Sequence, residues 1–371
     1  MKLEGIELRR IEMPLVAPFR TSFGTETVKQ ILLVRAVTTH AQGWGECVAD
    51  AIPAYSSEYV DAATHVIRDH FIPALAQADD ISMWDVAEVL GVYKGHPMAK
   101  AALEMAIMDA QLRSWGVSFR EFLGGRAHRV PAGVSVGIMG TVDELLDAVD
   151  GYITQGYVRI KLKIEPGWDI APVRAVRERF GDDLQLQVDA NTAYRLHDAR
   201  TLAGLDAFGL LLIEQPLPED DLRGHAALAA QLTTPICLDE SIVSARSAAD
   251  AIALGATSVV NIKPGRVGGY LEARRIHDVC AAHGVPVWCG GMLESGIGRA
   301  GNIALASLPN FTLPGDTSAS DRYYTTDITS PFVLQDGHVT VPTGDGLGVE
   351  PDRGILDRYT VSTQWISFTG S

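Results

Sequence analysis

The chain has 371 residues, of which 47% are hydrophobic and 21% charged, a globular composition that excludes extended disorder and favours two domains or one large domain with an appendage. Its 46 acidic residues against 31 lysines and arginines give a net charge of −15, which argues against nucleic-acid binding, because a phosphate backbone needs clustered positive charge. It has no apolar run of the roughly 18 residues that span a bilayer, and its charged start is unlike a signal peptide. We therefore expect a cytoplasmic protein that binds neither membranes nor nucleic acid, with its four cysteines reduced and mostly buried.

The first part of the chain, residues 1–128, predicts an α+β domain. Residues 3–15 and two segments within 30–50 have strand character, and residues 57–115 are rich in alanine, leucine and methionine at helical spacing. Strands followed by helices in this way are typical of an α+β arrangement. The tail, 326–371, shows strands and turns, and we expect it to return to this domain.

From Val130 onward, short β-branched runs alternate with helical stretches, which predicts a parallel sheet built from βαβ units. There are eight such runs, at 133–138, 157–164, 184–190, 209–216, 234–241, 258–265, 285–291 and 311–316. Their ends recur at gaps of 26, 25, 25, 24 and 28 residues, at Lys163, Asp189, Glu214, Asp239, Lys263 and Gly291. This period favours a closed β/α barrel over residues 129–325 rather than an open doubly wound sheet. A GxGxxG fingerprint is missing after the first run, which weakens a dinucleotide-binding interpretation.

Three acids end three successive runs: Asp189, Glu214 and Asp239. At the carboxyl ends of neighbouring barrel strands these side chains converge, and a barrel places its active site there. Crowded like charges repel, so a divalent cation is needed to neutralise them, and all-oxygen ligands suit Mg²⁺. One such acid alone would more often be a helix cap. Three at regular spacing favour a metal site.

Lysines occupy equivalent positions. Lys161 and Lys163 are two residues apart and therefore share one face of a strand, with Ile160, Leu162 and Ile164 on the other. Lys263 ends the sixth run, across the barrel from the second. These parts predict a reaction in which a substrate carboxylate binds the metal and one lysine removes the proton alpha to it. The metal charge offsets the extra negative charge of the enediolate, and nearby positive charge lowers the lysine pKa.

The motifs KLK at 161–163, DAN at 189–191, EQP at 214–216, DES at 239–241 and NIKPGRVGG at 261–269 resemble the enolase superfamily and, within it, the muconate-lactonizing-enzyme subgroup. The resemblance covers essentially the whole chain, including a PFRTSFG loop at 18–24. Segments such as RIKLKIEPGWD and PVWCGGMLESGIGRA are similar to the N-acylamino acid racemase/o-succinylbenzoate synthase family. The implied fold is α/β, a modified TIM barrel, (β/α)7β, with an α+β capping domain formed by the N-terminal part and the C-terminal tail.

The resemblance also implies roles for individual residues. Asp189, Glu214 and Asp239 hold Mg²⁺, with Mn²⁺ or Co²⁺ as alternatives, and Lys163 and Lys263 form an acid/base pair that Lys161 assists. The implied substrate-binding residues are Phe19, Phe23, Ser135, Asn191, Gly291, Met292 and Tyr323. The implied activity is racemisation of N-acylamino acids, N-succinylamino acids among them, together with o-succinylbenzoate synthesis by dehydration, in a symmetric homo-oligomer, an octamer or a dimer. Menaquinone synthesis and amino-acid conversion both stay open as pathways.

Other activities fit less well. A mandelate-racemase-type enzyme would end the seventh strand with a histidine, where this chain has Cys289-Gly290-Gly291. Dipeptide epimerases usually carry DxD near strand eight, where this chain has Gly315-Asp316-Thr317-Ser318. A muconate-type cycloisomerase is disfavoured by the KPGRVGG segment but stays open. A non-catalytic scaffold would have lost a metal ligand or a lysine, and none is missing.

Three further acids invite interpretation. We expect Glu46 to be an exposed acid in a turn, and Glu240 to point away from Asp239 and support it indirectly, because adjacent strand residues face opposite ways. Asp316 is expected to shape the barrel mouth, with a hydrogen bond to Lys263 or Arg266 as an alternative.

Overall fold

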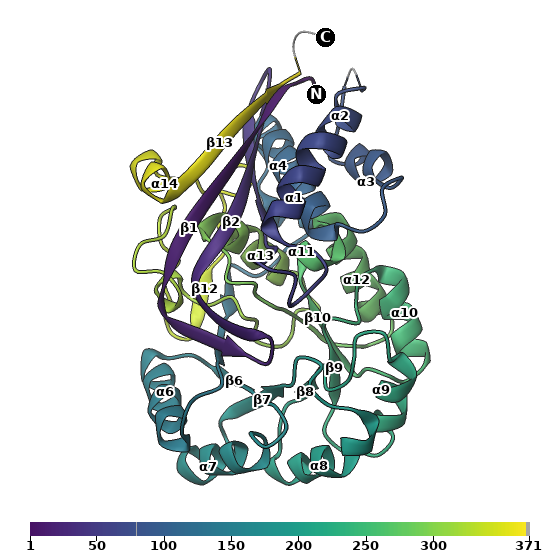
Figure 1. Cartoon of the computed structure of the whole chain (residues 1–371), viewed down its shortest axis with the longest axis vertical. Helices are drawn as coiled ribbons and strands as arrows, with labels where there is room; N and C mark the ends of the chain where they lie inside the picture. Colours follow the sequence, from purple (N-terminus) through teal and green to yellow (C-terminus); the bar gives the residue numbers. More distant parts are fainter. Residues whose placement is uncertain (79, 369–371) are drawn as a thin grey trace.

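The computed structural model describes residues 1–78 and 80–368 and shows an antiparallel sheet with helices above a curved parallel sheet (Figure 1). The antiparallel sheet has the strand order β13-β1-β2-β3. Its strands are β1 (Leu3–Thr21), β2 (Gly24–Thr38), β3 (Gln42–Cys47) and β13 (Thr360–Ser367). Because β1 and β2 run on to Thr21 and Gly24, the predicted 18–24 loop is the end of a long β-hairpin, which reaches down to the barrel in Figure 1.

The helices of this upper part follow β3 in the chain, as predicted. They are α1 (Val60–Val66), the π-helix η1 (Ile67–Phe71), α2 (Ile72–Leu75), α3 (Asp85–Leu90), α4 (Pro97–Trp115) and α5 (Phe119–Leu123). The long helix α4 is buried along most of its length, since its alanines and methionines allow close packing on every side. A Cβ at Gly43 or Gly45 of β3 would lie 2.1 or 2.0 Å from the α4 backbone, so glycine there lets strand and helix touch.

The lower part is a parallel sheet of seven strands in chain order, covered by helices on its outer face. The strands are β5 (Gly133–Val136), β6 (Arg159–Lys163), β7 (Gln185–Asp189), β8 (Ile213–Glu214), β9 (Ile236–Leu238), β10 (Val259–Ile262) and β11 (Val287–Cys289). The helices between and after them are α6 (Val142–Gln155), α7 (Ile170–Phe180), α8 (Ala199–Ala203) with η2 (Leu196–Asp198) and η3 (Gly204–Phe208), α9 (Leu222–Ala229), α10 (Ala245–Ala253), α11 (Pro264–Val267), α12 (Tyr270–Ala282) and α13 (Gly296–Ala306). The predicted βαβ alternation is confirmed.

The eighth predicted run, 311–316, does not form a regular strand in the described part of the chain. It makes isolated parallel bridges instead, from Phe311 to Val287 of β11 and from Gly315 to Ala132, next to β5. The backbone nitrogen of Asp316 also donates to the Cys289 carbonyl at 2.8 Å, and Gly133 donates to the Gly315 carbonyl at 2.7 Å. This irregular segment, whose Pro314 cannot donate to a ladder, therefore lies between β11 and β5.

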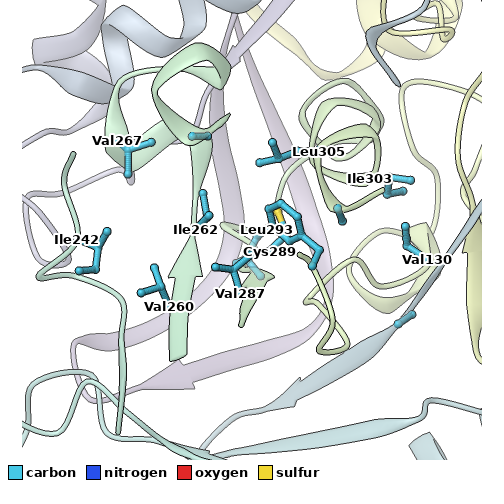
Figure 2. Close-up of a cluster of buried hydrophobic side chains, with 14 of the residues drawn as sticks. Val130, Ile242, Val260, Ile262, Val267, Val287, Cys289, Leu293, Ile303 and Leu305 are labelled. Atoms are coloured by element: carbon cyan, nitrogen blue, oxygen red, sulfur yellow. The ribbon is translucent and has the colours of Figure 1, made fainter. Parts of the chain in front are cut away.

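Side chains alternate between the two faces of the curved sheet. On β10, Val260 and Ile262 face the covering helices, as do Val287 and Cys289 of β11, and Figure 2 shows them clustered with other buried apolar side chains. The intervening position Trp288 belongs to a separate interior cluster. The same alternation on β6 places Ile160 and Leu162 outward in the core, so Lys161 and Lys163 face inward as predicted.

Two buried glutamates of the upper part bind the N-termini of barrel helices. Glu104 of α4 accepts from the Leu271 nitrogen of α12 at 3.1 Å. Glu46 of β3 accepts from Ser295 and Gly298 at the start of α13, at 3.0 and 2.9 Å from their backbone nitrogens. The expectation that Glu46 is exposed is therefore wrong: it lies inside a strand, 4% exposed, because free helix N–H groups of the barrel need an acceptor.

These glutamates predict a stability that depends on pH. Burial raises the pKa of Glu104 to about 7, above its ordinary value of 4.5. Between these two values the folded state binds a proton that the unfolded state releases. The contribution of this proton to the free energy of unfolding is lost as the pH rises from about 4.5 to about 7. We compare the free energy of unfolding of the natural chain with that of Glu104→Gln. The value for the natural chain minus the value for the variant should be larger at pH 5 than at pH 8, by on the order of 2 kcal/mol. Urea unfolding at both values measures it, with the exposed Glu178→Gln as the control. An advantage independent of pH would contradict the assignment.

The tail adds elements to both parts. Strand β12 (His338–Thr340) pairs with β4 (Arg129–Pro131), and β13 pairs with β1 in the upper sheet. The tail also contains the short helix α14 (Arg353–Tyr359), and the 3-10 helix η4 (Ser320–Arg322) lies just before the tail; neither was predicted from the sequence. Across the described residues, none of the helices has the length and apolar character needed to cross a membrane. All four cysteines are free and buried, as predicted.

Candidate active site

The three predicted metal ligands lie side by side at the carboxyl ends of their strands. Asp189 ends β7 and Glu214 ends β8, and the two are directly opposite each other in the parallel register. Asp239 follows β9 immediately. All three are at most 1% exposed. The regular spacing in the sequence therefore corresponds to a row of carboxylates along neighbouring strands.

Lysines lie along both ends of this row. Lys163 Nζ is 2.6 Å from Asp189 Oδ2, and Lys161 Nζ is 3.1 Å from Glu214 Oε2 and 3.4 Å from Asp189. At the other end, Lys263 Nζ is 2.7 Å from Asp239 Oδ2. Lys163 comes from the second strand of the parallel sheet and Lys263 follows the sixth. The two predicted acid/base lysines therefore approach the acids from different strands.

The acids and lysines shift one another's protonation. Burial would raise the pKa of Asp189, but the charges of Lys163 and Lys161 outweigh it and hold that pKa well below its usual range. Burial would likewise lower the pKa of Lys161, yet Asp316, Glu214 and Asp189 raise it. The pKa of Lys263 is raised in the same way by its neighbours. The predicted lowering of a lysine pKa is therefore not seen for Lys161 or Lys263, because carboxylates surround both.

The donor set suits a hard divalent cation. Three carboxylates, with only oxygen donors, lie at adjacent strand ends, and the neighbouring Glu240 has a buried Oε2 without a hydrogen-bond partner in the described residues. The carboxylates are turned toward the lysines, so no group of three or more His, Cys, Asp or Glu side chains in the described residues is spaced as a ready metal site. A cation would compete with the lysines for the same oxygens. The residues therefore fit a metal by their chemistry and by their placement on the strands.

The capping loop after β3 contributes a residue that the sequence analysis missed. Tyr55 lies with its hydroxyl 3.1 Å from Lys263 Nζ and 3.5 Å from Arg266, and its ring faces Lys263 at 4.9 Å. Arg266 also pairs with Asp239. Lys263 is thus held between a carboxylate and an aromatic ring. Tyr55 carried no motif, and its role depends on a contact between residues 208 positions apart.

A buried charged cluster lies beneath Lys161. Asp316 accepts from Arg159 at 2.9 Å through one oxygen and from Lys161 at 2.7 Å through the other, and both cations face the ring of Trp288. The alternative in which Asp316 bonds Lys263 or Arg266 is therefore wrong, because its two oxygens pair with Arg159 and Lys161 instead. Arg159 could have been found from the sequence, since it is two residues before Lys161 and shares its face.

A cavity of about 370 Å³ opens onto the lysines. Lys161, Lys163 and Lys263 line it, while the three acids lie beneath them. It contains every residue predicted to bind substrate, namely Phe19, Phe23, Ser135, Asn191, Gly291, Met292 and Tyr323. Residues that the sequence analysis did not assign to it include Lys29, Tyr55, Leu293 and Asp316.

The end of the β1–β2 hairpin forms one wall of this cavity. Phe19 packs edge-on against Tyr323 at 6.2 Å between ring centroids, and Phe23 packs edge-on against Tyr55 at 5.8 Å. Ser22 Oγ donates to the carbonyl of Asn191 at 3.3 Å. Aromatic contacts of this kind add to the stability that burial gives. The hairpin end therefore lies against the turn after β7, and its Phe19 and Phe23 line the cavity.

Asn191 joins one lysine to Glu240. Its Oδ1 accepts from Lys163 Nζ at 2.6 Å, and its Nδ2 donates to Glu240 Oε1 at 3.0 Å. Burial, with the charge of Asp189, raises the pKa of Glu240 to about 7. Glu240 therefore contacts Lys163 indirectly, through Asn191, although the strand alternation used to orient it does not apply, because β9 ends at Leu238.

Comparison with known proteins gives matches along the whole chain. Residues 5–124 match the family described as "Mandelate racemase / muconate lactonizing enzyme, N-terminal domain", and residues 144–355 match "Enolase C-terminal domain-like". The chain is 69% identical to an N-succinylamino acid racemase of Amycolatopsis sp over 99% of this chain and 100% of that protein. It is 48% identical to an o-succinylbenzoate synthase of Geobacillus kaustophilus over 97% and 96% of the two chains.

Solved structures agree with these matches. The crystal structure of an enolase superfamily member from Listeria innocua Clip11262 superposes with a TM-score of 0.95 at 40% identity and covers 100% of both chains. The predicted fold class and the resemblance to the enolase superfamily are confirmed.

Proposed function

Because this chain is an enzyme that belongs to the mandelate racemase/muconate lactonizing enzyme family of the enolase superfamily, we propose that it racemises N-succinylamino acids and related N-acylamino acids. The observation that carries the proposal is the placement of Lys163 and Lys263, which approach one row of carboxylates from the second and sixth strands. A racemase needs a base on each face of the reacting carbon. The relatives that bear this activity by name are 69% and 43% identical to this chain.

Members of this superfamily depend on a divalent metal ion, and we propose Mg²⁺, with Mn²⁺ or Co²⁺ as substitutes, held by Asp189, Glu214 and Asp239. When bound, the ion supplies positive charge for the substrate carboxylate and for the charge that proton removal creates. Lys163 Nζ takes the α-proton of one enantiomer and Lys263 Nζ returns a proton to the other face, and the two exchange roles for the opposite enantiomer. Lys161, held by Asp316 and Glu214, adds fixed positive charge beside Lys163.

The cavity residues orient the substrate and exclude water. Phe19, Phe23 and Tyr323 close it on one side with apolar rings, and Met292 adds an apolar wall. We assign the acyl and amino-acid side chains to this apolar part, with Ser135, Asn191 and Gly291 near the polar end. The apolar lining matches substrates of varied side chain, because apolar contacts discriminate weakly between side-chain shapes.

A second activity, o-succinylbenzoate synthesis, is supported by the same residues and by relatives of that name at 48% and 45% identity. In that reaction Lys163 removes the α-proton and water is then lost, while Lys263 stays cationic. The ring of Tyr55, 4.9 Å from Lys263 Nζ, stabilises such a cation. One cavity could serve both reactions because both begin with the same proton removal.

The test is exchange of the α-proton in deuterium oxide. Purified chain with Mg²⁺ is expected to replace the α-proton of N-succinyl- or N-acetylamino acids by deuterium and to racemise them, as followed by proton NMR and optical rotation. Stripping the metal with a chelator should stop both, and added Mg²⁺ should restore them. A metal-loaded chain that exchanges no α-proton would refute the racemase proposal. Dehydration of a succinyl-cyclohexadiene carboxylate, the substrate of o-succinylbenzoate synthesis, tests the second activity separately.

We also propose a capping domain of residues 1–128, a catalytic barrel of 129–325 and a C-terminal segment, 326–371, that returns to the cap. The pairing of β13 with β1 supports the last assignment. Four free buried cysteines are compatible with the cytoplasm, and the family suggests a homo-oligomer, an octamer or a dimer. Sedimentation velocity measures that state directly.

A further inference from the structure

Gln215, in the Glu-Gln-Pro motif, has an unusual backbone. It directly follows Glu214 at the end of β8 and is 0% exposed. Its φ of +36° lies in the left-handed region that non-glycine residues rarely adopt. Such a conformation persists only where the surrounding contacts enforce it.

The side chain of Gln215 uses both its oxygen and its nitrogen. Oε1 accepts from the backbone nitrogens of Asp239 at 2.9 Å and of Ser241 at 3.2 Å. Nε2 donates to Ser241 Oγ at 2.7 Å and to the Leu217 carbonyl at 3.1 Å. All of the hydrogen-bonding positions of a glutamine amide are therefore filled. The amide fixes the turn that carries Asp239.

The backbone of Gln215 extends these links to both neighbouring strands. Its nitrogen donates to the Cys237 carbonyl of β9 at 2.8 Å, and its carbonyl accepts from Thr192 at 2.8 Å, in the turn after Asp189. One residue is thus bonded to the segments that follow β7, β8 and β9. Asp189 and Glu214 end β7 and β8, and Asp239 directly follows β9, so these segments adjoin all three carboxylates.

The chemistry explains why glutamine suits this position. A glutamate would add a fifth carboxyl group beside Asp189, Glu214, Asp239 and Glu240 and would lose the two Nε2 donors. An apolar side chain of equal length would leave the buried nitrogens of Asp239 and Ser241 without their acceptor. Only a neutral amide of this length satisfies both demands.

We propose that Gln215 is a positioning residue that sets the relative placement of Asp189, Glu214 and Asp239, and thereby the affinity of the site for a divalent cation. The inference rests on the proposed function, since it takes these carboxylates as the ligands. Groups that orient metal ligands typically contribute 10- to 100-fold to metal affinity. Gln215 itself does not touch the substrate or the reacting atoms.

The experiment titrates Mn²⁺ into the metal-stripped full chain, with calorimetry for affinity and the Mn²⁺ electron paramagnetic resonance signal for geometry. Gln215→Met is expected to weaken Mn²⁺ binding roughly 10- to 100-fold and to alter the signal. The matched control is Gln187→Met, a buried glutamine of β7 whose Nε2 has no partner among the described residues. Its affinity should stay within about twofold of the natural chain, which separates positioning from a general loss of a buried amide.

A second variant guards against misfolding of the first. Ser241→Ala removes the 2.7 Å bond to Nε2 and should give a smaller loss of affinity, and the double variant should bind no worse than Gln215→Met alone. If Gln215→Met folds and binds Mn²⁺ like the natural chain, the positioning role of Gln215 is overturned, while the proposed metal site is not. If Gln215→Met does not fold, the same result for Ser241→Ala overturns that role. A natural chain that binds no Mn²⁺ would overturn the proposed metal site as well.

Discussion

Replacing Lys163 by alanine is expected to stop α-proton exchange from one enantiomer of an N-succinylamino acid first, and Lys263→Ala to stop it from the other. Each lysine serves one face of the reacting carbon, so the remaining lysine can still remove the proton that faces it. Losing a general base lowers the rate roughly 10²- to 10⁴-fold. Racemisation needs both lysines and should fail in both variants. Deuterium incorporation into each pure enantiomer, followed by proton NMR, measures the exchange rate of each enantiomer in each of the two variants.

The control for this pair is Lys94→Ala, which removes an exposed lysine of the upper part of the molecule. It should leave exchange from both enantiomers unchanged. Equal loss of exchange from both enantiomers in Lys163→Ala would show that the two-face arrangement is wrong, or that the lysines act as one coupled group. The shared contact of Lys161 and Lys163 with Asp189 makes such coupling the main competing explanation.

Replacing Asp316 by asparagine is expected to destabilise the fold by about 3–5 kcal/mol, because it leaves the buried Arg159 without its carboxylate and takes one of three carboxylates from Lys161. Arg159 is 0% exposed and Lys161 is 2% exposed, so water cannot take the place of the lost charge. The neutral amide keeps the shape of the side chain and removes only its charge. Urea unfolding compared with the natural chain measures the loss.

Asp321→Asn is the matched control, since Asp321 lies five residues further along and is exposed. Its effect should be below about 0.5 kcal/mol, as for most surface substitutions. A loss of less than 1 kcal/mol for Asp316→Asn would mean that the cation–ring contacts with Trp288 hold Arg159 and Lys161 without the carboxylate.

The regular spacing of the strand-like runs was enough to predict the barrel, because each unit of a strand, a helix and two short connections needs a nearly constant number of residues. It also placed Lys163, Asp189 and Glu214 at strand ends, and strand alternation placed Lys161 on the face of Lys163. The eighth strand was not predictable in the same way. Residues 311–316 have the right composition, but Pro314 cannot donate to a ladder, and the segment forms only isolated bridges to β11 and to Ala132 beside β5.

Which charges pair, however, was decided by the tertiary structure. Glu46 was assigned a wrong environment and Asp316 wrong alternative partners, because sequence distance says nothing about which element lies opposite a side chain. Tyr55 had no signal of its own, and Gln215 stood in the EQP motif without an assigned role: one acts through a loop folded onto Lys263, the other through a turn that joins three strands.

The sequence by itself determined which residue types stand at which strand ends, since that depends on local periodicity of two and on a repeat of about 25 residues. Only the tertiary structure decided how the lysines divide among the acids and which neutral side chains hold them in place. The physical reason is that burial makes every charge and every amide find a partner, and these partners come from elements far apart in the chain.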